Sequence, residues 1–503
     1  MLELQRHAAI VLLVCVACVP ATASAQTPAR AVHPKVAEAL EVMRVWLEAE
    51  HAYDRIPGIS AALVHDQELL WSGGYGFAHP ERRDSATART LYSICSISKL
   101  FTSIALMQLR DRGQFALTDP VGKHLPWFTL EQAYPDAPAV TIEGILTHSA
   151  GLPRESAQPY WSAPAFPFPT REEIVAGLRG QKTLYPAWKY FQYSNLGLTL
   201  AGELVRELSG MPYDAYVKRN VLHPLGLHDT YSDMPEEHRG GRLAAGHAAL
   251  DREGARHPTP FFQARGIAPA AGYASTVNDL ARFASWQFRL EGDREEVLRA
   301  HTLREMQRVH YVDPEWQTFW GLGFSISRTD GRTFVGHGGS CPGYRSQLLM
   351  NMDDDVAAVF MANASGVNTA KYVRGMYDLV APVIRAAAKR KSADTAVTAD
   401  AQDSASAATP AAVELRDYVG TYSQQPWGGE TAIVLWEGGL AMLSLPTNEP
   451  RRALSKLKHT EGDTFRRIRA DEELGEEVIF ERDRSGAVIG FRQHGNVTPR
   501  VRH

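Results

Sequence analysis

One segment of the chain is unable to join a packed core, and it lies between two regions that can. Residues 386–412 read AAAKRKSADTAVTADAQDSASAATPAA, with a single valine as the only large apolar side chain. Such a stretch buries too little surface to offset the entropy lost on ordering, so it predicts a flexible linker over 386–411. The alternative is an Ala-rich helix that frays beyond its first turns. In either case the sequence predicts a domain boundary at this segment.

The region after the linker, residues 412–503, predicts a small all-β domain. Apolar β-prone runs at 433–436 and 440–445 flank Glu437-Gly438-Gly439, and a second pair with a Gly-containing turn occupies 478–491. Short runs separated by such turns are typical of β-hairpins.

The region before the linker mixes two periodicities. Val36, Leu40, Met43 and Leu47 have the spacing of an amphipathic helix, while short apolar runs near both ends have the length of strands. Strands at both ends with helices between them predict an α+β domain over 26–385, in which the terminal segments share one sheet. The predicted helices are 36–48, 99–109 and 196–208, and the predicted strands are 59–64, 69–71, 320–326, 334–337, 346–351 and 357–361.

The first residues predict an export signal. Ala8 to Val19 form a short apolar run after Arg6, and the small residues that follow end at Ala25. This pattern is typical of a secretory signal peptide over 1–25, and the run is shorter than the ~20 residues of a membrane-spanning helix. We therefore expect a periplasmic or secreted protein with no transmembrane span in the mature chain; lipidation of the leader stays open.

The overall composition excludes several classes of function. Lys and Arg total 53 against 57 for Asp and Glu, a net charge of -4, so no basic excess exists to bind nucleic acid. Four cysteines are too few for a disulfide-built scaffold, and two of them, Cys15 and Cys18, lie in the predicted signal. The sequence contains no H-E-x-x-H and no Walker or G-x-G-x-x-G loop, so we expect neither a metal nor a cofactor.

One spacing points to nucleophilic catalysis. Ser96 and Lys99, in LYSICSISKLF, are three residues apart at the start of a predicted helix, so their side chains share one face. A neutral lysine there is able to take the serine proton, and a helix N-terminus favours the anion that forms. The spacing alone is a weak signal, because it recurs at Ser455 and Lys458 and is more often a solvated helix pair.

Two further motifs add suitable groups. Tyr193-Ser194-Asn195 is the only Y-x-N among 18 tyrosines; its phenol can act as a base and its amide can orient a substrate carbonyl. The alternative there is a helix-capping Ser or Asn beside a packed Tyr. His337-Gly338-Gly339 ends a predicted strand, where the glycines would let a substrate backbone approach and the N–H groups of Ser340 and Ser96 would form an oxyanion hole.

Together the three motifs resemble those of the serine β-lactamase and penicillin-binding protein superfamily, most closely its class C-like branch of D-peptidases and esterases. The likeness covers about residues 50–385 in order, with ILTHSAGLP at 145–153, HPLGLHDT at 223–230 and GHGGSCPGYRSQLLM at 336–350. It implies an antiparallel sheet flanked by helices, plus an all-helical subdomain. The C-terminal region is similar to the lipocalin-like β-barrel modules appended to such hydrolases.

The resemblance implies an acyl-enzyme mechanism. Ser96 would be the nucleophile, Lys99 its base partner, and Tyr193 a proton relay that later activates water. Asn195 would hold the substrate amide. The backbone N–H groups of Ser96 and Ser340 would stabilise the tetrahedral oxyanion.

The third motif departs from that of many β-lactamases, which begin it with a lysine that attracts the substrate carboxylate. Here the first residue is His337, a weaker anion partner when neutral, although an imidazolium below its usual pKa of ~6.5 would serve. With Gly338, Gly339 and Ser340 it is still expected to line the substrate site. The departure favours peptidase or esterase relatives over efficient β-lactam turnover.

The two remaining cysteines flank these motifs. Cys95 precedes the proposed nucleophile and Cys341 follows the third motif. Carbapenem-hydrolysing class A β-lactamases carry a disulfide at the same motif-relative positions, and this resemblance implies a Cys95–Cys341 bond in an exported protein. The alternative is two buried free thiols.

Two further segments lie near the motifs. His148 and Ser149 are expected to be structural, because a helix end there needs capping. The Pro- and aromatic-rich loop at 159–169 is expected either to line the cleft or to pack on itself.

The sequence therefore predicts an exported serine hydrolase that cleaves an amide or ester bond through an acyl-enzyme on Ser96. Its substrate would be a small molecule or peptide: a D-amino-acid peptide, an ester or a β-lactam, with cell-wall material as one source. The alternative is a penicillin-recognising or cell-wall-binding protein that has lost turnover. The role of the C-terminal domain (shaping the cleft, binding wall material or stabilising the enzyme) and the oligomeric state stay open.

Overall fold

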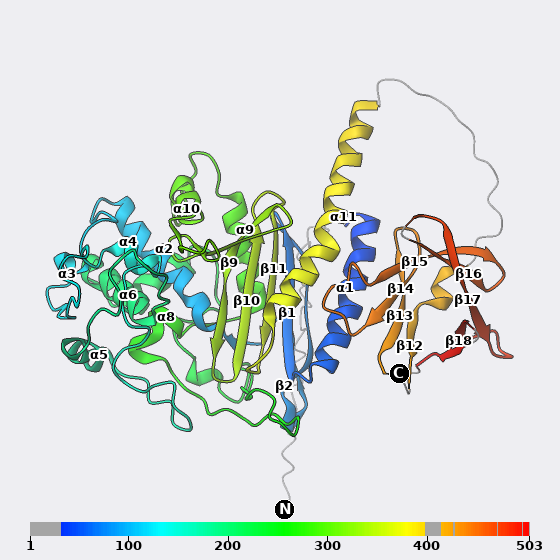
Figure 1. Cartoon of the computed structure of the whole chain (residues 1–503), viewed down its shortest axis with the longest axis horizontal. Coiled ribbons are helices and arrows are strands. Elements are labelled where there is room, and N and C mark those ends of the chain that lie inside the picture. Colours follow the sequence, from blue (N-terminus) through cyan, green and yellow to red (C-terminus); the bar gives the residue numbers. More distant parts are fainter. Residues whose placement is uncertain (1–31, 398–413, 426–427, 470, 495, 502–503) are drawn as a thin grey trace, which may run out of the picture.

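The structure is a computed structural model that describes residues 32–397, 414–425, 428–469, 471–494 and 496–501. The predicted signal peptide and the predicted linker from residue 398 onward lie outside these ranges. Figure 1 shows two parts, a larger α+β domain and a smaller all-β domain, which agrees with the predicted fold class.

A nine-stranded antiparallel sheet forms the centre of the larger domain. β1 (Gly58–His65) pairs with β11 (Val356–Ala362), so the two ends of the domain share one sheet, as the sequence predicts. Both strands are almost entirely buried, because the sheet is covered on its two faces. The order is β3-β2-β1-β11-β10-β9-β8-β7-β6, with β2 at Glu68–His79, β3 at Asp84–Ser85, β6 at Tyr311–Val312, β7 at Phe319–Trp320, β8 at Ser325–Thr329, β9 at Arg332–Cys341 and β10 at Tyr344–Asn351. The short strands β4 (Tyr92–Ser93) and β5 (Ala274–Ser275) pair separately.

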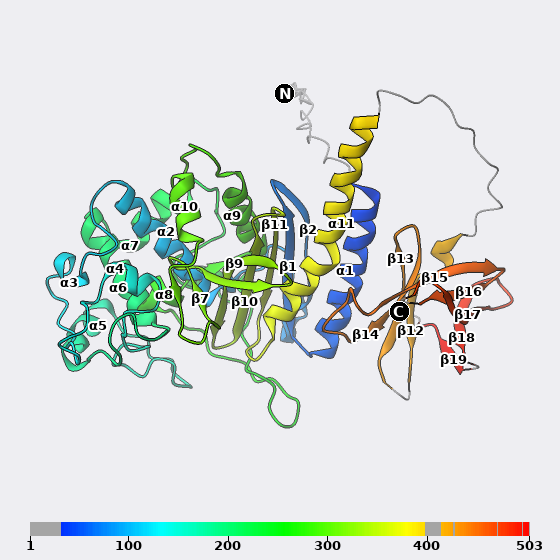
Figure 2. The same cartoon turned by 45° about the horizontal axis from the view of Figure 1, so that its top comes forward.

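Helices cover the two faces of the sheet and form two hydrophobic cores. The first core contains the apolar residues of α2, α6 and α9, and the second contains those of α1 and α11. The bounds are α1 Pro34–Tyr53, α2 Ser98–Asp111, α3 Val121–His124, α4 Ile142–Leu146, α5 Arg171–Gly177, α6 Asn195–Ser209, α7 Tyr213–Val217, α8 Ala268–Ala271, α9 Val277–Arg289, α10 Ala300–Met306 and α11 Thr369–Val397. Figures 1 and 2 both place α1 and α11 between the sheet and the smaller domain, with the α2, α4, α6 and α8 region on the opposite side.

Three elements differ from their predicted extent. β2 continues to His79 through a glycine-rich stretch, although glycines disfavour a strand. Glycine is needed at position 74 because a Cβ there would lie 2.5 Å from the Ala86 carbonyl oxygen. The strand predicted over 320–326 is divided into β7 and β8 by a turn at Gly323, whose φ is 86°. α11 continues past residue 385, so the Ala-rich helix alternative holds for 386–397.

The smaller domain is an eight-stranded antiparallel sheet in sequential order whose two edges meet. The Val501 N–H donates to the Thr421 carbonyl at 2.8 Å, and Tyr422 forms a bridge with Arg500. Aromatic side chains fill the interior, including Tyr418, Phe480 and Phe491. The strands are β12 Gly420–Ser423, β13 Glu430–Trp436, β14 Gly439–Leu445, β15 Leu454–Glu461, β16 Thr464–Ile468, β17 Leu474–Arg482, β18 Val488–Gln493 and β19 Asn496–Pro499.

The smaller domain packs on α1. Residues of β13 and β14 join the same hydrophobic core as α1 and α11. Trp46 Nε1 donates to the Thr447 carbonyl at 3.0 Å, and the Thr447 N–H donates to Glu50 at 2.5 Å. The two domains therefore share buried surface on the side of the sheet that carries α1.

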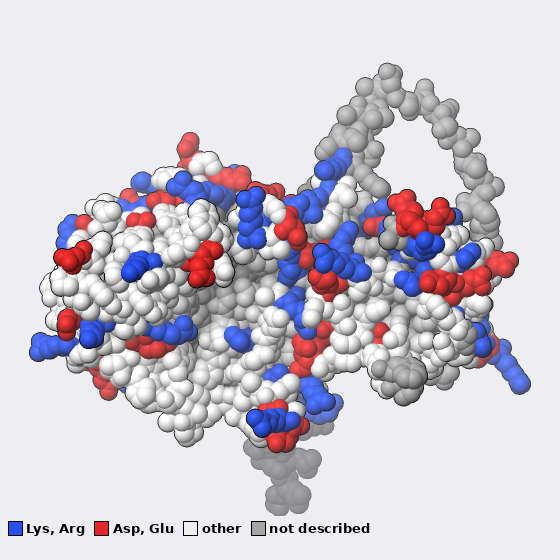
Figure 3. Space-filling view, in the orientation of Figure 1, with Lys and Arg blue, Asp and Glu red and all other residues white. Residues whose placement is uncertain are grey.

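On the face in Figure 3, acidic and basic residues are interspersed. Across the described residues, no helix combines the length and apolarity required to span a bilayer.

Candidate active site

Ser96 lies in a 3-10 turn, Cys95–Ile97, that leads directly into α2. Cys95 has a left-handed φ of 49°, an unfavourable conformation for a residue with a side chain. The Ser98 hydroxyl donates to the Cys95 carbonyl at 2.5 Å and accepts the Tyr273 N–H at 3.0 Å, which holds the turn against β5. The Ser96 side chain is consequently fixed in position and only partly buried.

Lys99 is fully buried and reaches back to Ser96. Its Nζ lies 3.2 Å from Ser96 Oγ, 2.8 Å from Asn195 Oδ1 and 2.7 Å from the Ala270 carbonyl oxygen. Burial lowers the pKa of Lys99 well below its usual value, against the opposing charge of Glu155. Asn195 Oδ1 and the Ala270 oxygen only accept hydrogen bonds, so they take the two N–H groups of a neutral amine and leave its lone pair facing the Ser96 hydroxyl.

Tyr193 lies beside the same pair. Lys99 Nζ is 4.8 Å from the centroid of its ring. Burial raises the pKa of the Tyr193 phenol, and a hydrogen bond with Ser96 opposes this effect. The phenol is therefore neutral at pH 7. The neutral Tyr193 hydroxyl is able to donate a proton and accept one, and it is not a permanently ionised phenolate.

The ring of Tyr193 is held by an aromatic cluster. His148 packs on it at a centroid distance of 4.3 Å, and Trp320 at 6.0 Å. His148 Nδ1 also accepts the Ser194 N–H at 3.1 Å. His148 also follows the last turn of α4 with a left-handed φ of 58°, and the Ser149 N–H donates to the Gly144 carbonyl at 3.0 Å. Both residues are thus structural and cap the end of α4, as predicted, and His148 also supports the Tyr193 segment.

Asn195 is engaged on both sides of its amide. Its Oδ1 accepts from Lys99, while its Nδ2 donates to the two carboxylate oxygens of Glu155 at 2.9 and 3.0 Å. A carboxylate only accepts, so Glu155 sets which way the amide is turned. Tyr160 also donates to Glu155. Sequence reasoning missed Glu155, whose only signal is its place two residues after the end of the 145–153 motif.

His337 lies in β9, buried between Tyr193 and Trp320. Burial, with a smaller contribution from Lys99, lowers the pKa of His337 to about 3. The ring is therefore neutral at pH 7, and the imidazolium alternative considered above does not hold there. Its Nδ1 lies 2.6 Å from the Gly338 carbonyl oxygen, which makes Nδ1 the protonated nitrogen.

The glycines after His337 have different neighbours. A Cβ at Gly339 would lie 2.2 Å from the Ile94 carbonyl oxygen, while one at Gly338 would lie 2.7 Å from the side-chain oxygen of Gln347. Gly339 therefore lets the segment before Ser96 pack closely against β9. It does not open space for a substrate. Ser340 is exposed and lines the cavity at Ser96.

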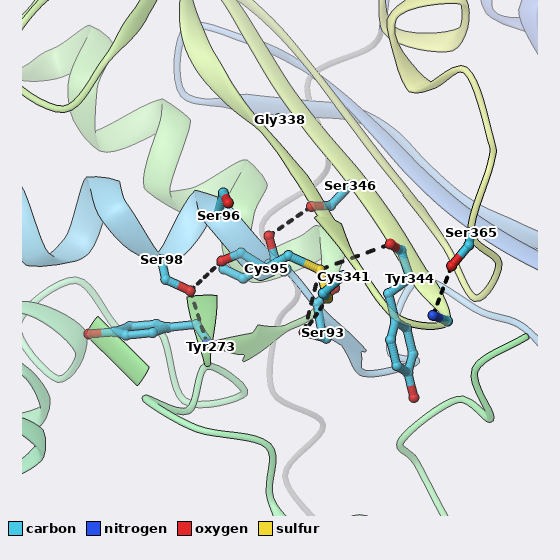
Figure 4. Close-up of a disulfide and its surroundings, with 12 residues drawn as sticks. Ser93, Cys95, Ser96, Ser98, Tyr273, Gly338, Cys341, Tyr344, Ser346 and Ser365 are labelled. Carbon is cyan, nitrogen blue, oxygen red and sulfur yellow. Dashed lines mark hydrogen bonds between the residues drawn. A yellow bond between two sulfur atoms is a disulfide. The ribbon is translucent and has the colours of Figure 1, made fainter. Parts of the chain in front are cut away.

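Cys95 and Cys341 form the disulfide that the resemblance implies. Figure 4 shows it joining the turn of Ser96 to the end of β9. The Ser93 hydroxyl lies 3.3 Å from the Cys341 sulfur, and the Ser346 hydroxyl donates to the Ile94 carbonyl at 2.9 Å. The 3-10 turn and the strand that carry the proposed oxyanion-hole groups are thus tied together.

A cavity of about 330 Å³ opens at Ser96. The loop at 159–169 serves both predicted purposes, since Trp161 lines this cavity while Phe168 packs on Phe262 at 5.2 Å. No residue of the smaller domain is among the described residues that line this cavity. The lining residues are Ser96, Arg154, Glu155, Trp161, Asn195, Ser340, Cys341, Pro342 and Ser365.

In the described part of the chain, His, Cys, Asp and Glu side chains form no group of three or more that is able to hold a metal ion.

Comparisons with known proteins agree with this geometry. The model of the Beta-lactamase family matches residues 45–381, and that of a domain of unknown function (DUF3471) matches 404–501. "Beta-lactamase-like protein 2" of Dictyostelium discoideum is 24% identical over 65% of this chain and 60% of the relative. "D-alanyl-D-alanine-carboxypeptidase/endopeptidase AmpH" of Escherichia coli (strain K12) is 27% identical over 45% of this chain and 56% of the relative.

The fold is also found among solved structures. The octameric penicillin-binding protein homologue from Pyrococcus abyssi superposes with a TM-score of 0.60 at 22% identity, over 91% of this chain and 99% of that one. The chain spans about three-fifths of the length of the curated relatives it matches. The β-lactamase and penicillin-binding protein fold predicted from the motifs is confirmed, and the chain belongs to the β-lactamase family.

Proposed function

We propose that this protein is an exported serine hydrolase that cleaves an amide or ester bond through an acyl-enzyme on Ser96. One observation carries the proposal: Lys99 Nζ is 3.2 Å from Ser96 Oγ, and its other two partners are acceptors. A buried amine with a lowered pKa in this arrangement is a base aimed at the serine proton.

In the acylation step, Ser96 Oγ forms a bond to the substrate carbonyl carbon as its proton passes to Lys99 Nζ. The N–H groups of Ser96 and Ser340 would stabilise the negative charge on the carbonyl oxygen. When the tetrahedral intermediate collapses, the bond to the leaving group breaks. The neutral Tyr193 phenol gives its proton to that group and is reprotonated from Lys99.

Deacylation reverses these proton movements. Water adds to the acyl carbon and gives a proton to the Tyr193–Lys99 pair, and that proton returns to Ser96 Oγ as the acid is released. Asn195 would hold the acyl amide through Nδ2. Since Glu155 already occupies this group in the described chain, substrate binding would exchange or share that contact.

The substrate class follows from the relatives and from the third motif. A relative bears the name D-alanyl-D-alanine-carboxypeptidase/endopeptidase, which favours D-amino-acid peptides or their ester analogues for this chain. His337 is neutral, so the β9 motif lacks the cation found in many β-lactamases, and we expect β-lactam turnover to be slow. A disulfide at the active site supports export, because disulfides persist in oxidising compartments.

The proposal is tested with a fluorophosphonate probe and a substrate panel of p-nitrophenyl esters, D-alanyl peptides and nitrocefin. Ser96→Ala is expected to abolish both labelling and turnover. Undiminished labelling of Ser96→Ala would contradict the nucleophile assignment. A burst of one product per chain without steady turnover would instead favour the alternative of a penicillin-recognising protein.

A further inference from the structure

A second cavity lies between the two domains, away from Ser96. It encloses about 940 Å³ and is bounded by β8, β9 and β10, by α11, and by residues 448–452 of the smaller domain. Figure 1 shows α11 between β10 and the smaller domain. The described residues that line this interdomain cavity include none of those that line the cavity at Ser96. A concave site of this size is able to enclose a small molecule.

The larger domain gives the interdomain cavity an apolar wall. Phe334 of β9 and Val373 of α11 are almost fully buried, and Leu349 of β10 is half-buried. Phe334 and Val373 belong to the hydrophobic core that contains α1 and α11, and Leu349 packs against that core. Part of a ligand in this cavity would therefore meet apolar surface.

Most of the charged groups around the interdomain cavity already have partners of opposite charge. Their ion pairs are between 2.7 and 2.9 Å long, so they leave little charge for a ligand. The pairs are Arg374 with Asp330 and Asp378, Arg452 with Glu449, and Lys371 with Glu50 and Asp54.

Arg451 differs from these groups. It is half-buried, and its guanidinium carbon lies 5.6 Å from the centroid of the Trp436 ring. The guanidinium makes no ion pair or hydrogen bond with another described residue, and its Nη1 is buried in this state. A half-buried cation without an anion lacks the charge that would compensate its desolvation. An anion in the cavity would supply that charge, and a planar guanidinium favours a carboxylate.

The larger domain supplies a second donor. Gln347 of β10 lines the same cavity, and its Oε1 accepts from the Thr369 hydroxyl at 3.3 Å. Gln347 Nε2 has no hydrogen-bond partner among the described residues. Because a carboxylate has two acceptor oxygens, one such ion is able to accept from Gln347 in one domain and from Arg451 in the other.

We propose that the interdomain cavity binds a small organic anion that consists of a carboxylate and an apolar body. The carboxylate is held by Arg451 and Gln347, and the apolar body packs on Phe334, Val373 and Leu349. A ligand held by both domains stabilises the folded chain. The inference is independent of the proposed function, since it uses no residue of the cavity at Ser96.

The test uses 2-naphthoate, a carboxylate on a rigid apolar ring system, and its uncharged counterpart 2-naphthamide. In calorimetric titrations of the full chain, naphthoate is expected to bind at least about tenfold more tightly than the amide, because its contact with Arg451 is charge-assisted. Arg451→Gln should lower the affinity for naphthoate by about tenfold or more and that for naphthamide by less than about twofold. Absence of naphthoate binding, or equal naphthoate affinity in Arg451→Gln, overturns the site.

Arg154→Gln is the matched control. Arg154 is also a cation over an aromatic ring, with its guanidinium carbon 4.9 Å from the centroid of Tyr193, but it lines the cavity at Ser96. It should leave the affinity for naphthoate unchanged. A loss of affinity in Arg154→Gln and not in Arg451→Gln would place naphthoate in the cavity at Ser96 and overturn the proposal.

Gln347→Met tests the contribution of the larger domain. It removes the amide donor and keeps the length of the side chain, so the affinity for naphthoate should fall by about three- to tenfold. An unchanged affinity would contradict a carboxylate held by both domains.

Thermal unfolding gives an independent measurement. Saturating naphthoate should raise the unfolding midpoint of the unaltered protein and have a smaller effect on Arg451→Gln, because a ligand stabilises the state that binds it. The midpoints without ligand check that each variant is folded. A rise of equal size in Arg451→Gln would show that naphthoate binds elsewhere and overturn the site.

Discussion

The spacing S-x-x-K occurs in both domains, and the two copies have different structures. Ser96 and Lys99 cross from a 3-10 turn into α2, which brings Oγ and Nζ to 3.2 Å. Ser455 and Lys458 lie in β15, where the pleat directs residues three apart to opposite faces. The same four-residue pattern is therefore a pair of contacting groups in one domain and two unrelated side chains in the other.

Burial separates the copies as well. Lys99 is 0% exposed and meets acceptors on two sides, whereas Lys458 is exposed to solvent and Ser455 accepts a hydrogen bond from Arg467 at 3.3 Å. Only a desolvated lysine loses its proton readily near neutral pH. The S-x-x-K spacing therefore predicts nucleophilic catalysis only where it coincides with a helix start and a buried lysine.

The largest difference in activity between the two copies is expected when their serines are replaced. Ser96→Ala should reduce kcat/KM for an activated ester by about 10⁴-fold or more, because removing the nucleophile disables the whole unit. Ser455→Ala should change it by less than about twofold. Ester hydrolysis by the two purified variants checks this, and a comparable loss in both would remove the distinction between the copies.

Replacing the two lysines should also reduce activity in only the first copy, by a smaller factor than replacing the serines. Lys99→Met keeps the length of the side chain but removes the base, so we expect a loss of about 10³-fold. Lys458→Met should have no measurable effect. The rate of fluorophosphonate labelling measures acylation directly, and normal labelling of Lys99→Met would exclude Lys99 as the base.

The helical copy is cross-linked and the strand copy is not. Replacing Cys95 and Cys341 with alanine should lower the free energy of unfolding by about 2–4 kcal/mol, because the bond closes a loop with a sequence separation of 246. The left-handed Cys95 would also lose its tether. Denaturant unfolding measures the loss, and reduction of the unaltered protein serves as control. An unchanged midpoint in both would contradict a stabilising role.

The sequence predicts the elements that carry these groups well, because their apolar periodicity is undisturbed. The helices predicted over 99–109 and 196–208 are observed as α2 and α6, and the hairpin with Glu437 and Gly438 at its turn is β13–β14. Both turn residues have positive φ, as a two-residue hairpin turn requires.

The unpredicted features depend on contacts between distant segments. Gly74 of β2 makes room for the Ala86 backbone, and the protonation state of His337 depends on its burial beside Tyr193 and Trp320. Glu155 has a partner, Asn195, forty residues along the chain. No periodicity in a single sequence encodes such contacts. The three motifs can therefore be predicted from the sequence, but the residues that orient them cannot.

The smallest expected effect concerns the charges around Lys99, and it has no counterpart at Lys458. Lys99 must be neutral to act as a base, so kcat/KM should fall as the pH falls through its pKa. Besides burial, the carboxylate of Glu155 raises this pKa and the guanidinium of Arg154 lowers it. Glu155→Gln should therefore move the acid limb of the profile to lower pH, and Arg154→Gln should move it to higher pH.

Glutamine at 155 keeps an oxygen for Asn195 Nδ2, so we expect the pH-independent rate to fall by no more than about tenfold. The profiles are recorded with an uncharged p-nitrophenyl ester, so that the charge of the substrate does not change with pH. Shifts of both variants in the same direction would mean that the limb belongs to another group. Opposite shifts would identify it with Lys99, because Lys99 feels the two charges with opposite sign, and would show that the helical S-x-x-K copy is tuned by residues outside its own motif.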